Sequence, residues 1–289
     1  MNEIIDSLSS YLKNSIKNMS SYGERHLLKG DFKNIEEGMN SGTFVKLSKS
    51  RIFKSYLSIV PQLILFKKEI FQNSFIKKYK TICNKQYRLF NWELIIHSIV
   101  LKILSDNNIL NGNICIIGDG KANFVHGILD LKNIKKIYSV NLPQALIQDY
   151  LVLKKNNSIK DNLIKVVENK KDLLDDTCRL FLVPAENKNL LENGKVNLFV
   201  NMFSFQEMPL HETRQYVNIA SHNEAYLYSL NREKKIMYDN TKINYQDFKI
   251  GEKSKIIFEN EATFARYFYN LKFPFIHRRE KTIHTLAKF

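Results

Sequence analysis

The chain is poor in cysteine, proline and glycine, and it contains no long apolar run. Its three cysteines, Cys83, Cys115 and Cys178, are far apart and include no CxxC pair, which argues against a disulfide framework or a zinc finger. Ten glycines and five prolines exclude a collagen-like or linker-rich chain. The most apolar run, residues 56–66, is shorter than the roughly 18 residues that a membrane-spanning helix needs. We therefore expect no transmembrane span.

The chain begins with MNEIID, which has acids where a secretory signal has basic residues followed by an apolar segment. A cytoplasmic protein is therefore expected. Its 289 residues are 44% hydrophobic and 25% charged, which excludes a disordered chain. This length fits either one large domain or one domain with a helical extension.

The net charge of +15 is mainly due to lysine, since the chain has 35 lysines and only 9 arginines. The basic residues are spread over the whole length, whereas proteins that read bases rely on arginine and on localised patches. We therefore do not expect nucleic acid as a partner. Attraction to an anionic substrate and peripheral contact with a membrane surface are the two alternative uses of this charge.

Residues 1–104 are predicted to form a helical N-terminal region with breaks at residues 20–23 and 38–42. The clearest helix covers residues 92–104 (WELIIHSIVLKIL), and Asn91 is placed to act as its N-cap. The histidine within this apolar helix is expected to be packed and hydrogen-bonded.

From residue 105 onward, short apolar runs alternate with helical segments. Strands separated by helices favour a doubly wound, mostly parallel Rossmann-like sheet with helices on both faces. Residues 105–289 are therefore predicted to form an α/β domain after the helical region. The predicted strands cover residues 114–117, 136–140, 179–183, 196–200 and 225–230, the helices cover 125–131, 145–153 and 212–220, and a terminal strand pair covers 255–258 and 273–277.

The first predicted strand runs directly into Gly118, Asp119 and Gly120. In doubly wound sheets the ligand lies beyond the carboxyl ends of the strands, where glycine lets the backbone approach it closely. The second strand ends at Asn141, at the position where an acid commonly holds ribose hydroxyls. An amide can also hydrogen-bond to a diol. The glycines and Asn141 each fit a plain turn as well, so both interpretations stay open.

The fourth predicted strand leads into NMFSFQEMP, residues 201–209. This loop combines amides, a hydroxyl, aromatic rings and one carboxylate, as the floor of a pocket would. We interpret Phe203, Phe205 and Met208 as packing residues and Glu207 as a site residue.

The order GDGKA, VNLP, FLVPAE, LFVNMFSFQEM and YLYSLNR resembles the class I S-adenosylmethionine-dependent methyltransferases. More narrowly, it resembles the bacterial sugar O-methyltransferase family, which has a glycine loop, an acid-Leu-Pro element, an Asn-x-x-Ser-Phe-Gln-Glu-Met element and a strand ending in Asn-Arg. The resemblance covers residues 90–235, and SFQEM and SLNR are its more specific parts.

The resemblance implies S-adenosylmethionine as the cofactor. Two residues depart from the family pattern, since Ile116 and Asn141 stand where the family has acids. These departures leave a catalytically weakened, methyltransferase-like binding subunit as an alternative. The implied cofactor contacts are Gly118, Asp119 and Gly120 with the methionine portion, Asn141 with the ribose, Leu142, Ala185 and Glu186 with the adenine, and Asn201 with the sulfonium.

The resemblance also implies methylation of a sugar hydroxyl on a bacterial surface glycan or its precursor, in polysaccharide biosynthesis. The acceptor would then be a sugar, a nucleotide-sugar or a lipid-linked glycan, with the helical N-terminal region capping the acceptor side. Because methyl transfer to a hydroxyl needs a base, Glu207 is the first candidate, His211 the second and His126 the third. No cluster with metal-ligand spacing lies near these loops, so no metal is expected.

Two other enzyme classes are compatible with a glycine loop after a strand. A nucleic-acid methyltransferase would have an Asn/Asp-Pro-Pro-aromatic loop where this chain has Asn-Met-Phe-Ser at residues 201–204. A nicotinamide-dependent oxidoreductase would have a third glycine where this chain has Asn123, and an acid where it has Asn141. The sequence favours the sugar methyltransferase over both.

Overall fold

The computed structural model describes the chain in six stretches, and the predicted breaks at residues 20–23 and 38–42 lie outside them. The described residues are 3–12, 49–86, 89–155, 158–237, 240–269 and 275–289.

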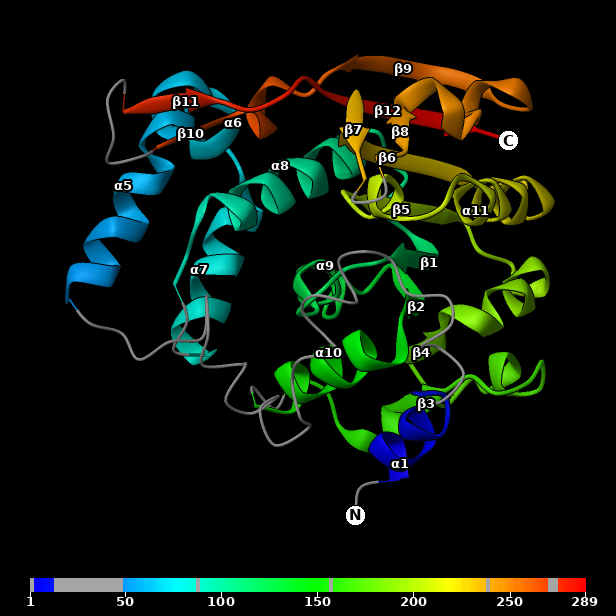
Figure 1. Ribbon diagram of the computed structural model, residues 1–289. Coiled ribbons are helices and arrows are strands. Elements are labelled where there is room, and N and C mark those ends of the chain that lie inside the picture. The colour runs from blue at the N-terminus through cyan, green and yellow to red at the C-terminus, as the bar shows by residue number, and fades with distance from the viewer. Residues whose placement is uncertain (1–2, 13–48, 87–88, 156–157, 238–239, 270–274) are drawn as a thin grey trace.

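An eight-stranded sheet forms the centre of the molecule, in the order β3-β4-β2-β1-β5-β6-β12-β9 (Figure 1). The strands from β3 to β6 in this order pair in parallel. Strand β12 is antiparallel to both of its neighbours, β6 and β9. The predicted doubly wound, mostly parallel sheet is confirmed. Its strands are β1 (Gly112–Ile117), β2 (Ile134–Asn141), β3 (Ile164–Val166), β4 (Leu180–Pro184), β5 (Leu198–Met202), β6 (Tyr226–Arg232), β9 (Lys255–Glu261) and β12 (Thr282–Lys288).

Helices cover both faces of this sheet. Apolar residues of α8, α9 and α10 belong to one buried core, and residues of α11 belong to the core on the opposite face. The described helices are α1 (Glu3–Ser10), α5 (Lys49–Leu65), α6 (Lys67–Phe71), α7 (Ser74–Gln86), α8 (Trp92–Asp106), α9 (Asn123–Ile128), α10 (Pro143–Lys155) and α11 (Leu210–His222).

The continuous apolar run of β1 follows from this two-sided covering. Ile114 and Ile116 face the core that contains α8, while Cys115 and Ile117 face the core that contains α11. Successive side chains of a strand point to opposite faces, so a strand buried on both faces needs apolar residues at every position. This is why the central strands could be recognised from short unbroken apolar runs.

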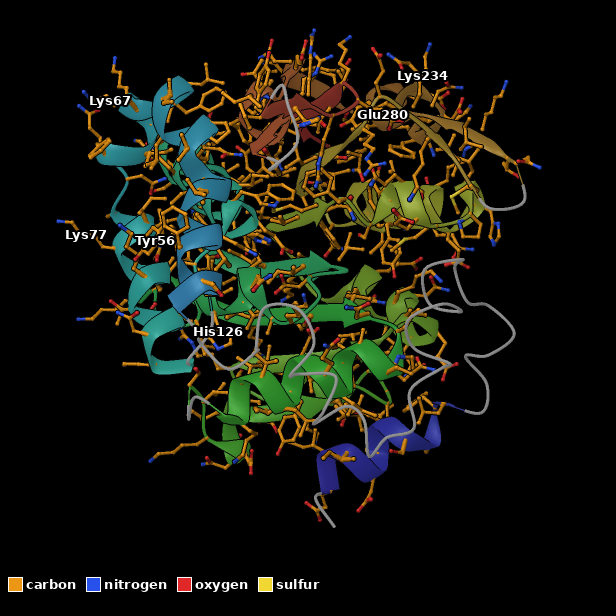
Figure 2. The ribbon with its side chains drawn as sticks, turned by 60° about the vertical axis from the view of Figure 1, so that its left-hand side comes forward. Tyr56, Lys67, Lys77, His126, Lys234 and Glu280 are labelled. Carbon is orange, nitrogen blue, oxygen red and sulfur yellow. The ribbon has the colours of Figure 1, made fainter. Side chains whose placement is uncertain are left out.

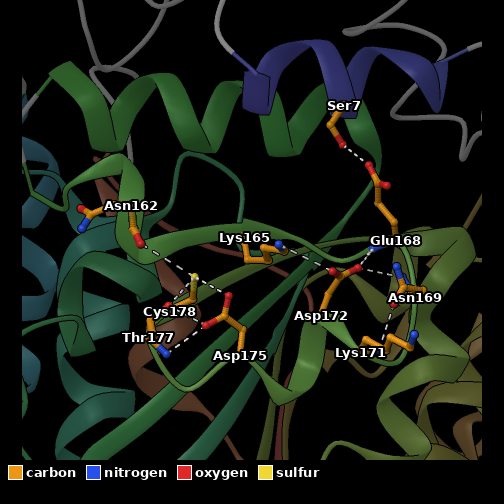
Figure 3. Close-up of polar contacts among 10 residues, drawn as sticks. All are labelled: Ser7, Asn162, Lys165, Glu168, Asn169, Lys171, Asp172, Asp175, Thr177 and Cys178. Atoms are coloured by element: carbon orange, nitrogen blue, oxygen red, sulfur yellow. Dashed lines mark hydrogen bonds and ion pairs between the residues drawn. The ribbon is translucent and has the colours of Figure 1, made fainter.

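The N-terminal helices lie in two places (Figure 1). Helix α1 lies beside α10 and β3, where the Ser7 hydroxyl donates to the Glu168 carboxylate over 2.6 Å (Figure 3). Helices α5 to α8 lie together on the other side, and Figure 2 shows Lys67 and Lys77 pointing outward from them. The predicted cap of α8 is confirmed, because the Asn91 side chain accepts from the Leu94 backbone N–H. In the described part of the chain, no helix has the length and apolarity to cross a membrane.

The end of the chain differs from the prediction. Of the strand predicted at residues 273–277, the structure describes only residues 275–277, and its prediction as a partner of β9 is wrong for these residues, since the strand paired with β9 is β12. A separate two-stranded ribbon joins β10 (Tyr267–Tyr269) to β11 (Ile276–Arg278), and another joins β7 (Lys234–Ile236) to β8 (Lys242–Asn244). Strand β12 was missed because His284 and Lys288 interrupt its apolar pattern.

Candidate active site

A cavity of about 410 Å³ lies at the carboxyl ends of β1, β2, β4 and β5. The chain passes from β1 to β2 on one side and later returns to β5 on the other, so this is the switch point at which doubly wound sheets bind ligands. Eight of the predicted site residues line the cavity: Gly118, Asp119, Gly120, Asn141, Leu142, Ala185, Glu186 and Glu207.

The glycine loop has left-handed backbone at four positions. Gly118, Gly120, Lys121 and Ala122 have φ between 49° and 70°. A Cβ on Gly118 would lie 2.5 Å from the Ser204 side chain, so this glycine is required by close packing on the β5 loop. A Cβ on Gly120 would meet no atom within 4 Å, so the space beside this glycine is open. Glycine adopts such conformations without strain, whereas Lys121 and Ala122 need support from their surroundings.

That support comes from a buried acid, Asp149 on α10, which the sequence analysis missed. Its carboxylate accepts from the Ala122 N–H over 2.8 Å. The neighbouring Asp119 accepts from the N–H groups of Phe124 and Val125 over 2.7 and 2.9 Å, at the start of α9. Burial raises the pKa of Asp149 to about 7, and burial together with the Asp149 charge raises the pKa of Asp119. The sequence signal that could have identified Asp149 is the presence of an acid within the mostly apolar segment 145–153.

Asn141 connects the end of β2 to this acid. Its side-chain oxygen accepts from the Leu142 N–H over 3.0 Å, and a hydrogen bond from its side chain to Asp149 lowers the pKa of that carboxyl. The hydrogen bond from the Leu142 N–H orients the amide, which lines the cavity. At the end of β2 the cavity wall therefore carries an amide, Asn141, and the buried acid Asp149 lies outside the cavity lining.

Asn201 lies beneath the cavity wall, fully buried. Its side chain bonds to Ser204 and accepts from Asn231 over 2.8 Å. Next to it, the Gln206 side-chain oxygen accepts from the Arg232 N–H over 2.8 Å. The SFQEM and SLNR segments, which carry the narrower resemblance, are thus bonded to each other. Asn201 positions the loop and does not line the cavity.

The three candidate bases lie in different environments. Glu207 lines the cavity and its carboxylate pairs with Lys235 on β7. The His211 side chain is 71% exposed on α11, outside the cavity lining. His126 is buried, with ring nitrogens 2.8 Å from the Ala122 carbonyl and 3.1 Å from the Ser158 hydroxyl. The structure brings only Glu207 to the cavity among these three.

Further cavity residues could not be recognised from the sequence. Lys188, which follows β4, is 2.8 Å from the Glu212 carboxylate on α11, and its ammonium lies over the Tyr216 ring. Glu93 and His97 reach the cavity from α8. These contacts join segments far apart in the chain, so no local pattern indicates them. In the stretches that the structure describes, no group of three or more His, Cys, Asp or Glu side chains is arranged to hold a metal ion.

The sheet order and these loops give the chain a doubly wound, Rossmann-like fold. No family model and no curated protein matches the chain. Among solved structures, it is similar to an S-adenosylmethionine-dependent methyltransferase from Clostridium acetobutylicum, with 11% identity over 67% of this chain and 90% of that one and a TM-score of 0.43.

It is also similar to the N-methyltransferase NodS from Bradyrhizobium japonicum, with 9% identity over 68% and 96% of the two chains and a TM-score of 0.43. A third similar structure is the methyltransferase domain of bacterial CtHen1, with 11% identity over 69% and 100% and a TM-score of 0.41. Similarity at this level indicates neither a family nor a substrate.

Proposed function

We propose that the protein is an S-adenosylmethionine-dependent O-methyltransferase that acts on a sugar hydroxyl of a bacterial surface glycan or its precursor. The observation that carries this proposal is that four strands end at one cavity. Gly120 lines this cavity, and the space beside this glycine is open. The narrower choice of a sugar acceptor is supported by the SFQEM and SLNR segments, which are bonded together beside that cavity.

The residues of the cavity wall are chemically suited to the proposed cofactor. The Gly118–Gly120 loop would hold the methionine portion, and Asn141 and Leu142 would hold the ribose and adenine. Ala185 and Glu186 would border the adenine, where the Glu186 carboxylate could accept from an amino group; burial raises the pKa of this carboxyl. S-adenosylmethionine, when bound, supplies an electrophilic methyl group on a positively charged sulfur.

Glu207 is proposed as the base that accepts the proton of the acceptor hydroxyl. Its carboxylate lines the cavity, and the ion pair with Lys235 fixes its orientation. A positioned base contributes roughly 10²–10⁴-fold to such a reaction. Glu207→Gln should therefore lower turnover by about that factor while the affinity for S-adenosylhomocysteine is kept. The exposed Glu192→Gln is the matched control, and wild-type turnover in Glu207→Gln would remove Glu207 from this role.

The alternative is a methyltransferase-like subunit that binds but does not catalyse. The observation that favours it is the hydrogen bond from the Leu142 N–H to the Asn141 side-chain oxygen, which engages the amide that would meet the ribose. Calorimetry with S-adenosylhomocysteine decides whether the cofactor site is functional. Saturable one-to-one binding is expected, and absence of binding would refute the proposed enzyme. A nucleic-acid acceptor would instead give tight binding to DNA or RNA that weakens steeply with salt.

A further inference from the structure

Helix α5 carries apolar side chains on the face that points away from the core. Phe53, Tyr56 and Ile64 are each more than half exposed. Together with the half-buried Val60 they are spaced by three or four residues, so they form one stripe along the helix. Ile59, on the other face, packs into the core that contains α8. A surface helix is normally polar on its outer face, so the apolar stripe of α5 indicates an interaction site.

The apolar surface continues beyond this stripe. Leu65 is the last residue of α5 and Phe71 is the last residue of α6, and both side chains are exposed. The two helices follow each other directly and are in contact. Proteins that act as monomers seldom expose several large apolar side chains on neighbouring elements. The stripe and these two side chains are called the α5–α6 surface below.

The helices in this part of the molecule are strongly basic. Residues 49–86, from the start of α5 to the end of α7, contain nine lysines and arginines and a single acid, Glu69. This excess of eight positive charges is more than half of the net charge of +15 of the chain. Lys67, Lys68 and Lys77 are exposed. Among the residues that the structure describes, none of these three lysines forms an ion pair with an acid.

The apolar and the cationic side chains lie on the same side of the molecule. Figure 2 shows Tyr56 on the side from which Lys67 and Lys77 point outward. This combination favours a lipid surface over a protein partner. Protein interfaces are enriched in arginine and depleted in lysine, whereas eight of the nine basic residues here are lysines. Helices that lie in a membrane interface combine lysines with phenylalanine and leucine, and lysines are attracted to negatively charged headgroups.

We propose that the α5–α6 surface binds peripherally to a membrane that contains anionic lipids. The apolar side chains enter the boundary between headgroups and acyl chains, and the exposed lysines contact the anionic headgroups. Contact with a membrane surface is one of the two uses of the positive charge that the sequence leaves open. This inference goes beyond the proposed function and does not depend on methyl transfer.

Sedimentation with lipid vesicles tests the inference on the full chain. One set of vesicles contains phosphatidylcholine alone, and the other contains phosphatidylcholine and phosphatidylglycerol in equal parts. We expect binding to the mixed vesicles to be at least about tenfold tighter than to phosphatidylcholine alone, and to weaken as the sodium chloride concentration rises. No binding, or equal binding to the two compositions, would overturn the inference.

Phe53→Gln and Ile64→Gln should each weaken binding to the mixed vesicles by at least about fivefold, because each removes an apolar side chain that enters the lipid. Glutamine is chosen because it retains a high helix propensity. The matched control is Leu174→Gln, at an exposed apolar side chain that follows β3, and it should bind like the wild type. Equal weakening by Leu174→Gln would refute the assignment to the α5–α6 surface. Far-UV circular dichroism confirms that each variant is folded.

The contribution of the lysines is tested in the same way. Lys67→Gln combined with Lys68→Gln should weaken binding to the mixed vesicles by at least about tenfold. The matched control combines Lys170→Gln with Lys171→Gln, which removes the same charge from two adjacent exposed lysines after β3. Figure 1 shows β3 beside α1, away from α5 and α6. Equal weakening by the two double variants would reduce the effect to net charge and overturn the inference.

A second copy of the chain is the other occupant to be tested. Size-exclusion chromatography with light scattering should give a monomer for the wild type. A dimer that Phe53→Gln dissociates would assign the α5–α6 surface to self-association and overturn membrane binding. Calorimetry with S-adenosylhomocysteine is independent of the vesicle measurement, so failure of membrane binding leaves the methyltransferase proposal standing, and absence of cofactor binding leaves the membrane surface standing.

Discussion

Replacement of Asp149 by asparagine is expected to change how the stability of the protein depends on pH. Asp149 is fully buried, and its pKa rises from 3.8 to about 7 because burial disfavours the charged form. Between these pH values the folded protein binds more protons than the unfolded chain. The free energy of unfolding therefore falls as the pH rises from about 4 to about 7. A shift of about three pKa units corresponds to on the order of 4 kcal/mol.

The substitution keeps the shape of the side chain and an oxygen that can accept from the Ala122 N–H, but it removes the charge. Asp149→Asn should therefore match the wild type near pH 4 and exceed its stability at pH 8, by up to about 4 kcal/mol. Urea unfolding followed by circular dichroism at several pH values measures this difference. Asp130→Asn, at a side chain that is 73% exposed, is the control and should follow the wild-type curve.

Either of two outcomes would refute the reasoning. If Asp149→Asn showed the same fall in stability with pH as the wild type, the buried carboxyl would not be the source of the dependence. If the variant were less stable than the wild type at pH 8, the ionised carboxylate would be a net stabilising group.

Two further predictions concern the glycine loop and the cap of α8. Gly120→Ala should weaken S-adenosylhomocysteine binding, measured by calorimetry, because the added methyl projects into open space beside the cavity. Gly118→Ala should mainly lower the unfolding temperature, because its methyl collides with Ser204. Equal effects of the two substitutions on both measurements would contradict this division. Asn91→Ala should lower the free energy of unfolding by about 1 kcal/mol through loss of the bond to the Leu94 N–H, measured by urea unfolding; an unchanged midpoint would show that the cap contributes nothing.

The amino-acid sequence was sufficient for the elements whose signals are local. The runs that became β1 and β4 are apolar at successive positions, because helices bury both faces of these strands. Asn91 identified the start of α8 because a cap acts within one turn of its own helix. The glycine loop also was located correctly, since a left-handed turn after a strand needs glycine at particular positions.

The tertiary structure decided what these elements bring together. The pairing of Glu207 with Lys235, the hydrogen bond from the Ala122 N–H to Asp149 and the exposure of His211 depend on how distant segments pack. The position of β12 between β6 and β9 likewise depends on the hydrogen-bonding edges that these two strands offer, and the residues of β12 do not indicate this position. Local pattern fixes the conformation of each segment because propensity and burial act over a few residues. The chemistry of the cavity arises only where side chains from separate segments meet.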